Sequence, residues 1–485
     1  MIVNHNSRLK TFFRILLPSF VADRLFPEHR PTWKLHPTSY LDGLRGIASV
    51  IVFFCHYTEN NFYPLIDTYG LDPNQPGGWI QLPYVRVIFS GRPMVHIFFV
   101  ISGFVLSYKP IKAIHARDMD KCYTALSSST FRRAFRLFGP CFVSTFIIMC
   151  LAQMGYHKVQ KDSWAEHFWT WEWAMFHQIT WGWEWNKDLR PFFDPHLWTI
   201  PIEFAHSMLL FMVILMVSRV RLRIRQAMVF GLMIYCSACG KWAGFEFLTG
   251  LFLAEIHILQ NSSRPGWELS DKGHYSPRKV LKTLKFFLHI TILLVGLYIA
   301  GWPNRNADKT PGIRYLLQKT PEPYINDQED LTAASKYWFG ISAAFLVWTV
   351  GEMPILKRFF EGSIAQYSGR ISYAIYICHG PMLDFFEKKV VGTPFIPAQG
   401  EPGQEGYREA ILAKGVKGMV GVATSTQMEI GWIIGLVILT PFVVWVSDIF
   451  WRLVDDTVVK LGRKMELALL DDVESPRSQG YSTVA

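Results

Sequence analysis

The sequence predicts an all-α integral membrane protein with about ten transmembrane helices in one bundle. Three observations support this fold class. Half of the 485 residues are hydrophobic and only 18% are charged, which is less charge than soluble proteins of this length usually carry. The apolar residues gather in runs close to the about 20 residues that a helix needs to cross a bilayer. The basic residues gather in short loops after every second run, as the positive-inside rule requires of a multi-pass protein.

The apolar runs define the predicted spans, which we place near residues 41–58, 94–112, 136–154, 197–217, 227–241, 244–260, 284–301, 335–351, 370–390 and 429–451. Basic clusters follow the even-numbered spans, so all of them face the cytoplasm if both termini are cytoplasmic. The two spans within 227–260 are short, and they either cross the membrane twice or form a re-entrant pair. Asn261 begins a glycosylation sequon that this topology places in the cytoplasm.

Three regions follow from this pattern. Residues 1–37 form a cytoplasmic N-terminal segment, in which the basic and aromatic stretch 8–27 is expected to lie on the membrane surface as an interfacial helix, kinked or divided at Pro18. Residues 38–455 form the transmembrane domain. Residues 456–485 form a cytoplasmic tail whose polar end is expected to be disordered.

Composition also excludes several classes of site. The seven cysteines are an odd number and most lie in apolar runs, which favours buried free thiols over a disulfide framework. No phosphate-binding loop, His-Glu-x-x-His helix or Cys/His cluster with zinc spacing is present, so we predict no metal and no permanently bound cofactor. The net charge of +10 is concentrated in loops, where it sets orientation and does not indicate a nucleic-acid partner.

The first span carries an ionisable group near each end, Arg45 and His56. Eleven residues at about 100° each bring the two side chains to within roughly 20° of one helix face, about 16.5 Å apart along the axis. Ionisable groups at membrane depth usually mark a function. This geometry suits a long anionic ligand whose reactive end lies far from its phosphates.

Four further segments accompany this Arg-x10-His pair: Phe98-Phe99-Val100-Ile101-Ser102-Gly103-Phe104, Arg132-Arg133-Ala134-Phe135-Arg136, Leu197-Trp198-x4-Glu203, and Ser372-Tyr373-x2-Tyr376-x2-His379-x-Pro381. In these five segments and their order the chain resembles the membrane-bound acyltransferase-3 family, in a fungal-like branch. The likeness runs from about residue 38 to 455. Two departures bear on the acceptor: His96 stands where bacterial members commonly have aspartate, and Phe204 stands where a second acid often follows Glu203.

The resemblance implies transfer of an acyl group, commonly from acyl-coenzyme A, to a hydroxyl of a carbohydrate or small metabolite, and it assigns the essential pair to Arg45 and His56. Independently of the family, an imidazole with a pKa near 6.5 is suited to take a proton from a hydroxyl at neutral pH. We therefore expect His56 to be the general base that takes the proton of the acceptor hydroxyl during transfer of an acetyl or other short acyl group. Acyl-coenzyme A is expected to be the donor substrate and not a permanently bound cofactor. Membrane lipid is expected to surround the bundle.

The other candidate residues divide by their expected ligand. Arg45, Arg133 and Arg136 are expected to bind the donor phosphates, although Arg45 could instead pair with Asp42 and basic residues in this loop also serve orientation. Glu203 is expected either to orient His56 or to receive acceptor hydroxyls. Acceptor contact is expected from His96, Asp194, His196, Trp198, Tyr376 and His379, while interfacial anchoring is the simpler explanation for the many tryptophans between Trp164 and Trp198.

A proton-coupled transporter or channel is the alternative, because buried His, Glu and Arg also suit a carrier. Against it, no repeat relates the two halves of the chain. The sequence leaves open whether the acceptor is a secondary metabolite or a glycan, and whether the protein lies in an endomembrane or the plasma membrane.

Overall fold

The structure is a computed structural model, and it describes residues 14–26, 34–71, 77–156, 161–181, 190–262, 277–325, 332–394, 396 and 410–470. Across these residues the chain is built of helices, and the extended pairing is limited to an isolated bridge between Ile396 and Ile411. The all-α fold class is confirmed. Trp183 and Trp185 of the tryptophan-rich loop lie outside the described residues.

A helix occupies each segment that the apolar pattern marks. These helices are α3 (Ser39–Asn61), α4 (Gly91–His115), α5 (Met119–Gln153), α7 (Thr199–Val217), α8 (Leu222–Ala238), α9 (Trp242–Ser262), α10 (Pro277–Ala300), α13 (Ala333–Glu352), α16 (Ser372–Val390) and α18 (Ser425–Phe450). Helix is the conformation that satisfies every backbone hydrogen bond within one apolar segment, which explains the agreement.

The predicted number of about ten membrane spans is not confirmed. Of the helices in the described residues, six are long and apolar enough to cross a membrane: Gly91–His115, Met119–Gln153, Pro195–Val217, Trp242–Asn261, Leu281–Ala300 and Ser425–Leu469. A seventh span is added if α13 and α14 (Pro354–Phe360), which meet at a 97° bend, count as one. Helix α8 has 17 residues, and the polar and charged residues of α3 and α16 lower their hydropathy.

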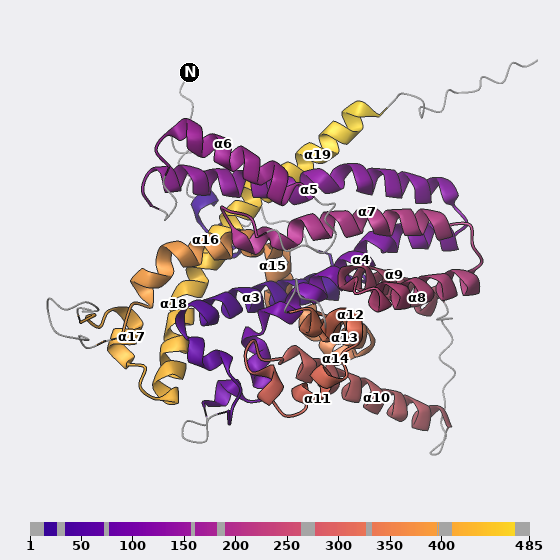
Figure 1. Cartoon of the computed structure of the whole chain (residues 1–485). Coiled ribbons are helices and arrows are strands. Elements are labelled where there is room, and N and C mark those ends of the chain that lie inside the picture. The colour runs from indigo at the N-terminus through magenta and orange to yellow at the C-terminus, as the bar shows by residue number, and fades with distance from the viewer. Residues whose placement is uncertain are drawn as a thin grey trace, which may run out of the picture.

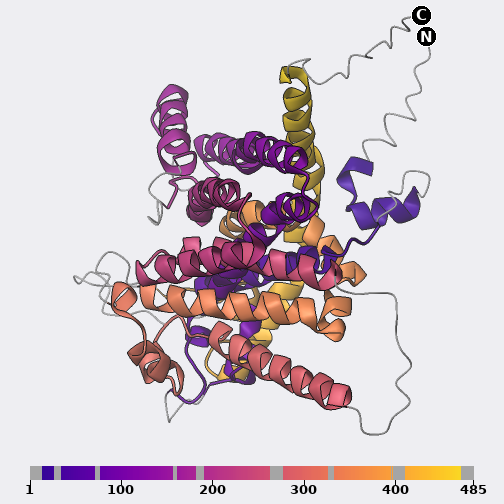
Figure 2. The same ribbon diagram turned by 90° about the vertical axis from the view of Figure 1, so that its right-hand side faces the viewer.

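Helices α3, α4 and α9 run through the middle of the bundle, as Figure 1 shows. Helices α4 and α9 approach closely at Gly103 and Gly250, where neither helix has a side chain in the way. A Cβ atom at either glycine would collide with the backbone of the other helix. Helices α10 and α13 lie side by side along one edge (Figure 2). Helices α16 and α18 pack together on the other side, and α16 also contacts α3.

The two ends of the described chain meet near α18. The short helix α2 (Ser19–Leu25) follows Pro18, and the Ser19 hydroxyl donates a hydrogen bond of 2.6 Å to Asp448. Arg452 donates to the backbone carbonyls of residues 14, 15 and 17. Residues 14–26 belong to the stretch that we expect to lie on the membrane surface. Their helical structure is divided at Pro18, and hydrogen bonds hold them to the end of α18. The expected tail begins with α19 (Asp456–Leu469), and residues 471–485 lie outside the described residues.

Candidate active site

A cavity of about 320 Å³ lies at the Arg45 end of α3. Its wall contains four arginines, Arg45, Arg133, Arg136 and Arg370, which come from three helices. The remaining lining is mostly apolar and aromatic, with Phe98, Phe99, Tyr373, Tyr376 and Trp451 among its members. We call this space the arginine cavity. Guanidinium groups bind phosphate through paired hydrogen bonds, so the cavity has the chemistry expected of a nucleotide-phosphate site.

Arg45 forms the ion pair that was one of its two expected roles, and it also lines the arginine cavity. Its Nη2 atom lies 3.3 Å from the Asp42 carboxylate and 3.2 Å from the backbone oxygen of Gly369, while the side chain remains 31% exposed and lines the cavity. Its Nε atom is buried without a hydrogen-bond partner among the described residues. The ion pair therefore uses only part of the guanidinium, and donor capacity remains for a ligand.

Glu203 is paired with Arg133 in the cavity wall. Arg133 Nη2 lies 2.6 Å from Glu203 Oε1, and its Nε donates to the Ser207 hydroxyl over 2.9 Å. Ser102 donates a further hydrogen bond of 2.9 Å to the same carboxylate oxygen. Two predicted site residues are thus brought together, but Glu203 contacts an arginine of the cavity and not His56. The carboxylate of Asp455 acts electrostatically on Arg136 and Arg45 from the far wall.

Tyr376 separates the arginine cavity from a second group of residues. Its ring lines the cavity, and its hydroxyl donates a hydrogen bond to the backbone carbonyl of His196. Thr199, which also lines the cavity, lies 2.7 Å from the same hydroxyl. The His379 ring stands 6.1 Å from the Tyr376 ring on the other side. Tyr376 and Thr199 are therefore shared between the cavity wall and the histidines beyond it.

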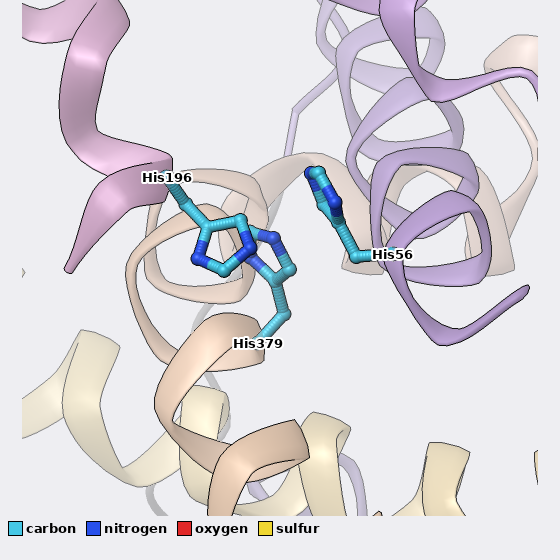
Figure 3. Close-up of side chains that lie close together, drawn as sticks. All are labelled: His56, His196 and His379. Carbon is cyan, nitrogen blue, oxygen red and sulfur yellow. The ribbon is translucent and has the colours of Figure 1, made fainter. Parts of the chain in front are cut away.

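Three histidines converge there from distant parts of the chain (Figure 3). His56 comes from α3, His196 from the short helix η6 (Pro195–Trp198), and His379 from α16. The ring centroids of His56 and His196 are 4.4 Å apart, those of His196 and His379 are 4.8 Å apart, and those of His56 and His379 are 5.4 Å apart. We call this group the histidine cluster.

Each ring of the histidine cluster has a partner at Nδ1. His56 Nδ1 lies 3.3 Å from Glu59, His196 Nδ1 lies 2.8 Å from Asp194, and His379 Nδ1 lies 3.1 Å from the backbone oxygen of residue 375. A carbonyl or carboxylate at Nδ1 fixes the hydrogen there and leaves the lone pair on Nε2. The Nε2 atom of His379 is buried and has no hydrogen-bond partner among the described residues. In the neutral form of each ring, Nε2 is therefore the nitrogen that can accept a proton.

Comparison with protein-family models gives a match along nearly all of the helical bundle. Residues 38–452 match the family model described as "Acyltransferase domain". The chain belongs to this acyltransferase family. It is an enzyme that transfers acyl groups, and the fungal-like resemblance seen in the sequence is confirmed.

Three fungal proteins are similar to this acyltransferase along most of their length. The O-acetyltransferase PaAT-1 of Phomopsis amygdali is 31% identical over 84% of this chain and 83% of its own. Acyltransferase R4 of a Phoma species is 26% identical over 78% of this chain and 89% of its own. Acyltransferase clz18 of Cochliobolus lunatus is 25% identical over 72% and 84%. No solved structure matches.

Two of the predicted site residues of this acyltransferase belong neither to the lining of the arginine cavity nor to the histidine cluster. His96 is buried, and its Nδ1 atom lies 2.5 Å from Glu246 of α9. Trp198 packs against the main core with the ammonium group of Lys336 5.5 Å from its ring centre. Neither residue lines the arginine cavity. Acceptor contact by His96 and Trp198 stays a prediction without support from their positions.

The structure adds residues that the sequence analysis did not select. Glu59 is the chief one, because it joins His56 to Arg92, 3.3 Å away, and to Asn304, 2.6 Å away. Its signal in the sequence was the i,i+3 spacing from His56, which puts both on one helix face. Arg370 and Trp451 also line the arginine cavity, and no local pattern distinguishes them from ordinary loop-side arginine and interfacial tryptophan.

The histidine cluster is also where a metal ion would be sought. The ring nitrogens lie within 4.8 Å of one another. A tetrahedral zinc ion with Zn–N distances of about 2.0–2.1 Å needs nitrogens about 3.4 Å apart, which is a tighter spacing. The predicted absence of a metal stays a prediction, and metal analysis of the purified protein tests it.

Proposed function

We propose that this acyltransferase moves an acetyl or other short acyl group from acyl-coenzyme A to a hydroxyl of a small metabolite. The similar protein named an O-acetyltransferase supports both the acetyl group and the oxygen acceptor. A secondary metabolite is the proposed acceptor, with a carbohydrate as the alternative. The bundle is proposed to lie in a membrane with both termini in the cytoplasm, so that the donor enters from that side.

The observation that supports this proposal is the arrangement of the arginine cavity and the histidine cluster at opposite ends of one helix segment. Arg45 and His56 are eleven residues apart on α3, or about 16.5 Å along the axis. Coenzyme A carries its phosphates at one end of an extended arm and its thioester at the other. Phosphates held by Arg45, Arg133, Arg136 and Arg370 would leave the arm to run past Tyr376 toward the histidine cluster.

His56 acts as the general base in this proposal. Its Nδ1 atom faces Glu59, so Nε2 is free to accept the hydroxyl proton as the acceptor oxygen attacks the thioester carbonyl. The His56 side chain is 32% exposed, which leaves room for an acceptor to approach. A covalent acyl-histidine intermediate is the variant mechanism, and trapping of an acylated enzyme would distinguish it from direct transfer. Tyr376 and His379 are the residues proposed to contact the acceptor, while the buried Asp194 carboxylate is bonded to His196.

Purified protein in detergent, supplied with acetyl-coenzyme A and candidate alcohols, tests the reaction. We expect His56→Ala to abolish thiol release and product formation, while His36→Ala, at an exposed position before α3, keeps the wild-type rate. Retention of full activity by His56→Ala would remove the base from this mechanism. The acceptor is best found by metabolite profiling of a deletion strain, in which the compound that accumulates lacks one acyl mass.

A further inference from the structure

The histidine cluster contains a second histidine–carboxylate pair, and this pair is the better formed of the two. Asp194 Oδ1 accepts hydrogen bonds from His196 Nδ1, at 2.8 Å, and from the His196 backbone N–H, at 3.0 Å. Asp194 is 2% exposed, so its charge is shielded from water and acts strongly on the ring. The corresponding distance from His56 to Glu59 is 3.3 Å. A buried carboxylate at this distance fixes an imidazole for proton transfer through Nε2.

The His196 ring is held from several sides. Tyr376 fixes the backbone carbonyl of the same residue, and Asp194 caps the short helix η6 that carries it. Gly380 of α16 lies against the ring, and a Cβ atom at that position would collide with both the imidazole and the Asp194 carboxylate. An orientation fixed by backbone, carboxylate and close packing is what a proton-transfer group needs.

His196 is also the cluster member joined most directly to the arginine cavity. Thr199 follows three residues later and lines the cavity, and the cavity residue Tyr376 bonds the His196 carbonyl. His56 has a ring centroid 4.4 Å from that of His196 and lies next to Glu59 and the 45%-exposed Arg92, and its helix contributes only Arg45 to the cavity lining. A thioester that arrives from the cavity would therefore meet His196 with its sulfur side, while the acceptor hydroxyl would meet His56.

We propose that His196 is the general acid that protonates the departing coenzyme A sulfur, and that Asp194 is its positioning residue. This inference rests on the proposed acyl transfer from acyl-coenzyme A. The acceptor oxygen forms a bond to the carbonyl carbon, and its proton passes to His56 Nε2. His196 starts this step as the imidazolium, with protons on both ring nitrogens and Nδ1 held by Asp194. The tetrahedral intermediate then breaks its carbon–sulfur bond, the electron pair goes to sulfur, and the Nε2 proton of this imidazolium passes to that sulfur.

The cycle balances without a further reactant. An ester and free coenzyme A form, His56 ends with one more proton and His196 with one fewer. Both side chains are partly exposed, at 32% and 21%, so water can restore the two starting states. The buried ring of His379 packs against both, edge-on to His196 and stacked with His56.

The first test compares donors whose leaving groups need a proton to different degrees. We expect His196→Gln to lower kcat/KM with acetyl-coenzyme A by about 10²- to 10⁴-fold, as loss of a general acid does. With an acetyl ester of nitrothiophenol, whose thiolate is stable without a proton, the loss should shrink to less than about tenfold. His56→Gln should lose activity with both donors. His177→Gln, at an exposed position in η5 (Met175–Ile179), is the control and should match the wild type.

The pH profile of kcat/KM with acetyl-coenzyme A is the second readout and needs no alternative donor. A general acid must carry its proton, so His196→Gln should remove the fall in rate that the wild type shows at alkaline pH. Asp194, His56, His379 and, electrostatically, Asp384 and Glu59 face this imidazole, so Asp194→Asn should shift that alkaline limb. A variant that only distorts the site would lower kcat/KM by the same factor at every pH and would keep the shape of the pH profile.

Three results would overturn the proposal. The first is a His196→Gln enzyme with wild-type kcat/KM, and the second is an equal loss with both donors together with an unchanged profile shape. The third is about one metal ion per purified chain that is lost in His379→Ala, because a coordinated Nε2 atom cannot transfer a proton. Inactivity of His56→Gln and His196→Gln alike, with wild-type acetyl transfer also absent, would instead contradict the proposed function.

Discussion

Arg133 and Glu203 form an ion pair in the wall of the arginine cavity, with Nη2 and Oε1 2.6 Å apart and side-chain exposures of 8% and 17%. The pair connects α5 to α7. Ser102 of α4 donates a hydrogen bond to the same Glu203 carboxylate, so three helices meet at this group. A cation that is already neutralised is a poorer phosphate ligand than one that is free. In the proposed donor site we therefore expect Arg133 to shape the cavity wall and to contribute only part of the phosphate binding.

Arg133→Ala should lower stability by about 3–5 kcal/mol, because it leaves the Glu203 carboxylate buried without its cation. The neighbouring Arg132 provides a matched control, since its ion pair with Glu466 is 40% exposed on the arginine side and should contribute less than about 1 kcal/mol. Thermal unfolding of both variants in the same detergent measures the difference. Equal melting temperatures would show that the buried pair does not hold α5 to α7.

Glu59→Gln should lower kcat by about 10- to 100-fold and leave KM for acetyl-coenzyme A near its wild-type value, because the amide no longer fixes the His56 tautomer. Glu387→Gln on α16 is the control. The Glu387 carboxylate accepts hydrogen bonds from Asn60 and Asn61, which lie on α3 as His56 does, but it makes no hydrogen bond with His56. Steady-state kinetics separate the two parameters. A change in KM alone would place Glu59 in donor binding and not in orientation of the base.

Gly380→Ala should abolish most activity, because the added methyl group has no space between the His196 ring and Asp194. Gly231→Ala on α8 introduces the same methyl group into open space and should keep activity, with a gain of up to about 1 kcal/mol in helix stability. Acetyl transfer by the two purified variants gives the comparison. Full activity of Gly380→Ala would mean that the dyad tolerates displacement and is not the acid–base unit.

His96→Ala should destabilise the protein by about 1–3 kcal/mol without changing KM for the acceptor, since it removes a hydrogen-bond partner of the buried Glu246 side chain. His36→Ala, at an exposed position, controls for the loss of an imidazole. The melting temperature and the acceptor KM are measured on the same preparation. A raised KM at unchanged stability would restore the acceptor-binding role that the sequence predicts for His96.

Asn261 should carry no glycan, because the proposed topology places the end of α9 in the cytoplasm. Its side chain is exposed, so accessibility would not prevent modification if this end faced the lumen. Electrophoretic mobility before and after endoglycosidase treatment, with Asn261→Gln as the reference, gives the answer. A glycan at Asn261 would reverse the orientation and with it the side from which the donor enters.

The sequence predicted the parts of the site that depend on short-range geometry. The helical period alone places Arg45 and His56 on one face of α3, and the apolar pattern locates every main helix because segments in a membrane must satisfy their own backbone. The number of about ten membrane spans that the same reasoning predicts is not confirmed, since six helices of the described residues pass on length and composition. Charged residues within α3 and α16 make these two helices less apolar than a helix that faces lipid on all sides. A hydropathy window of about 20 residues does not show that α3 and α16 pack against other helices of the bundle.

By itself, the sequence determined the helical class, the family and the residue types that a phosphate-bearing donor and a proton-transfer step require. Only the tertiary structure decided which distant residues meet: His196 packs against His56 and His379, and Glu203 pairs with Arg133 and not with His56. The physical reason is range. Helix periodicity relates residues within a few turns, whereas the side chains of the histidine cluster are brought together by the packing of α3, η6 and α16, which depends on contacts along their whole length.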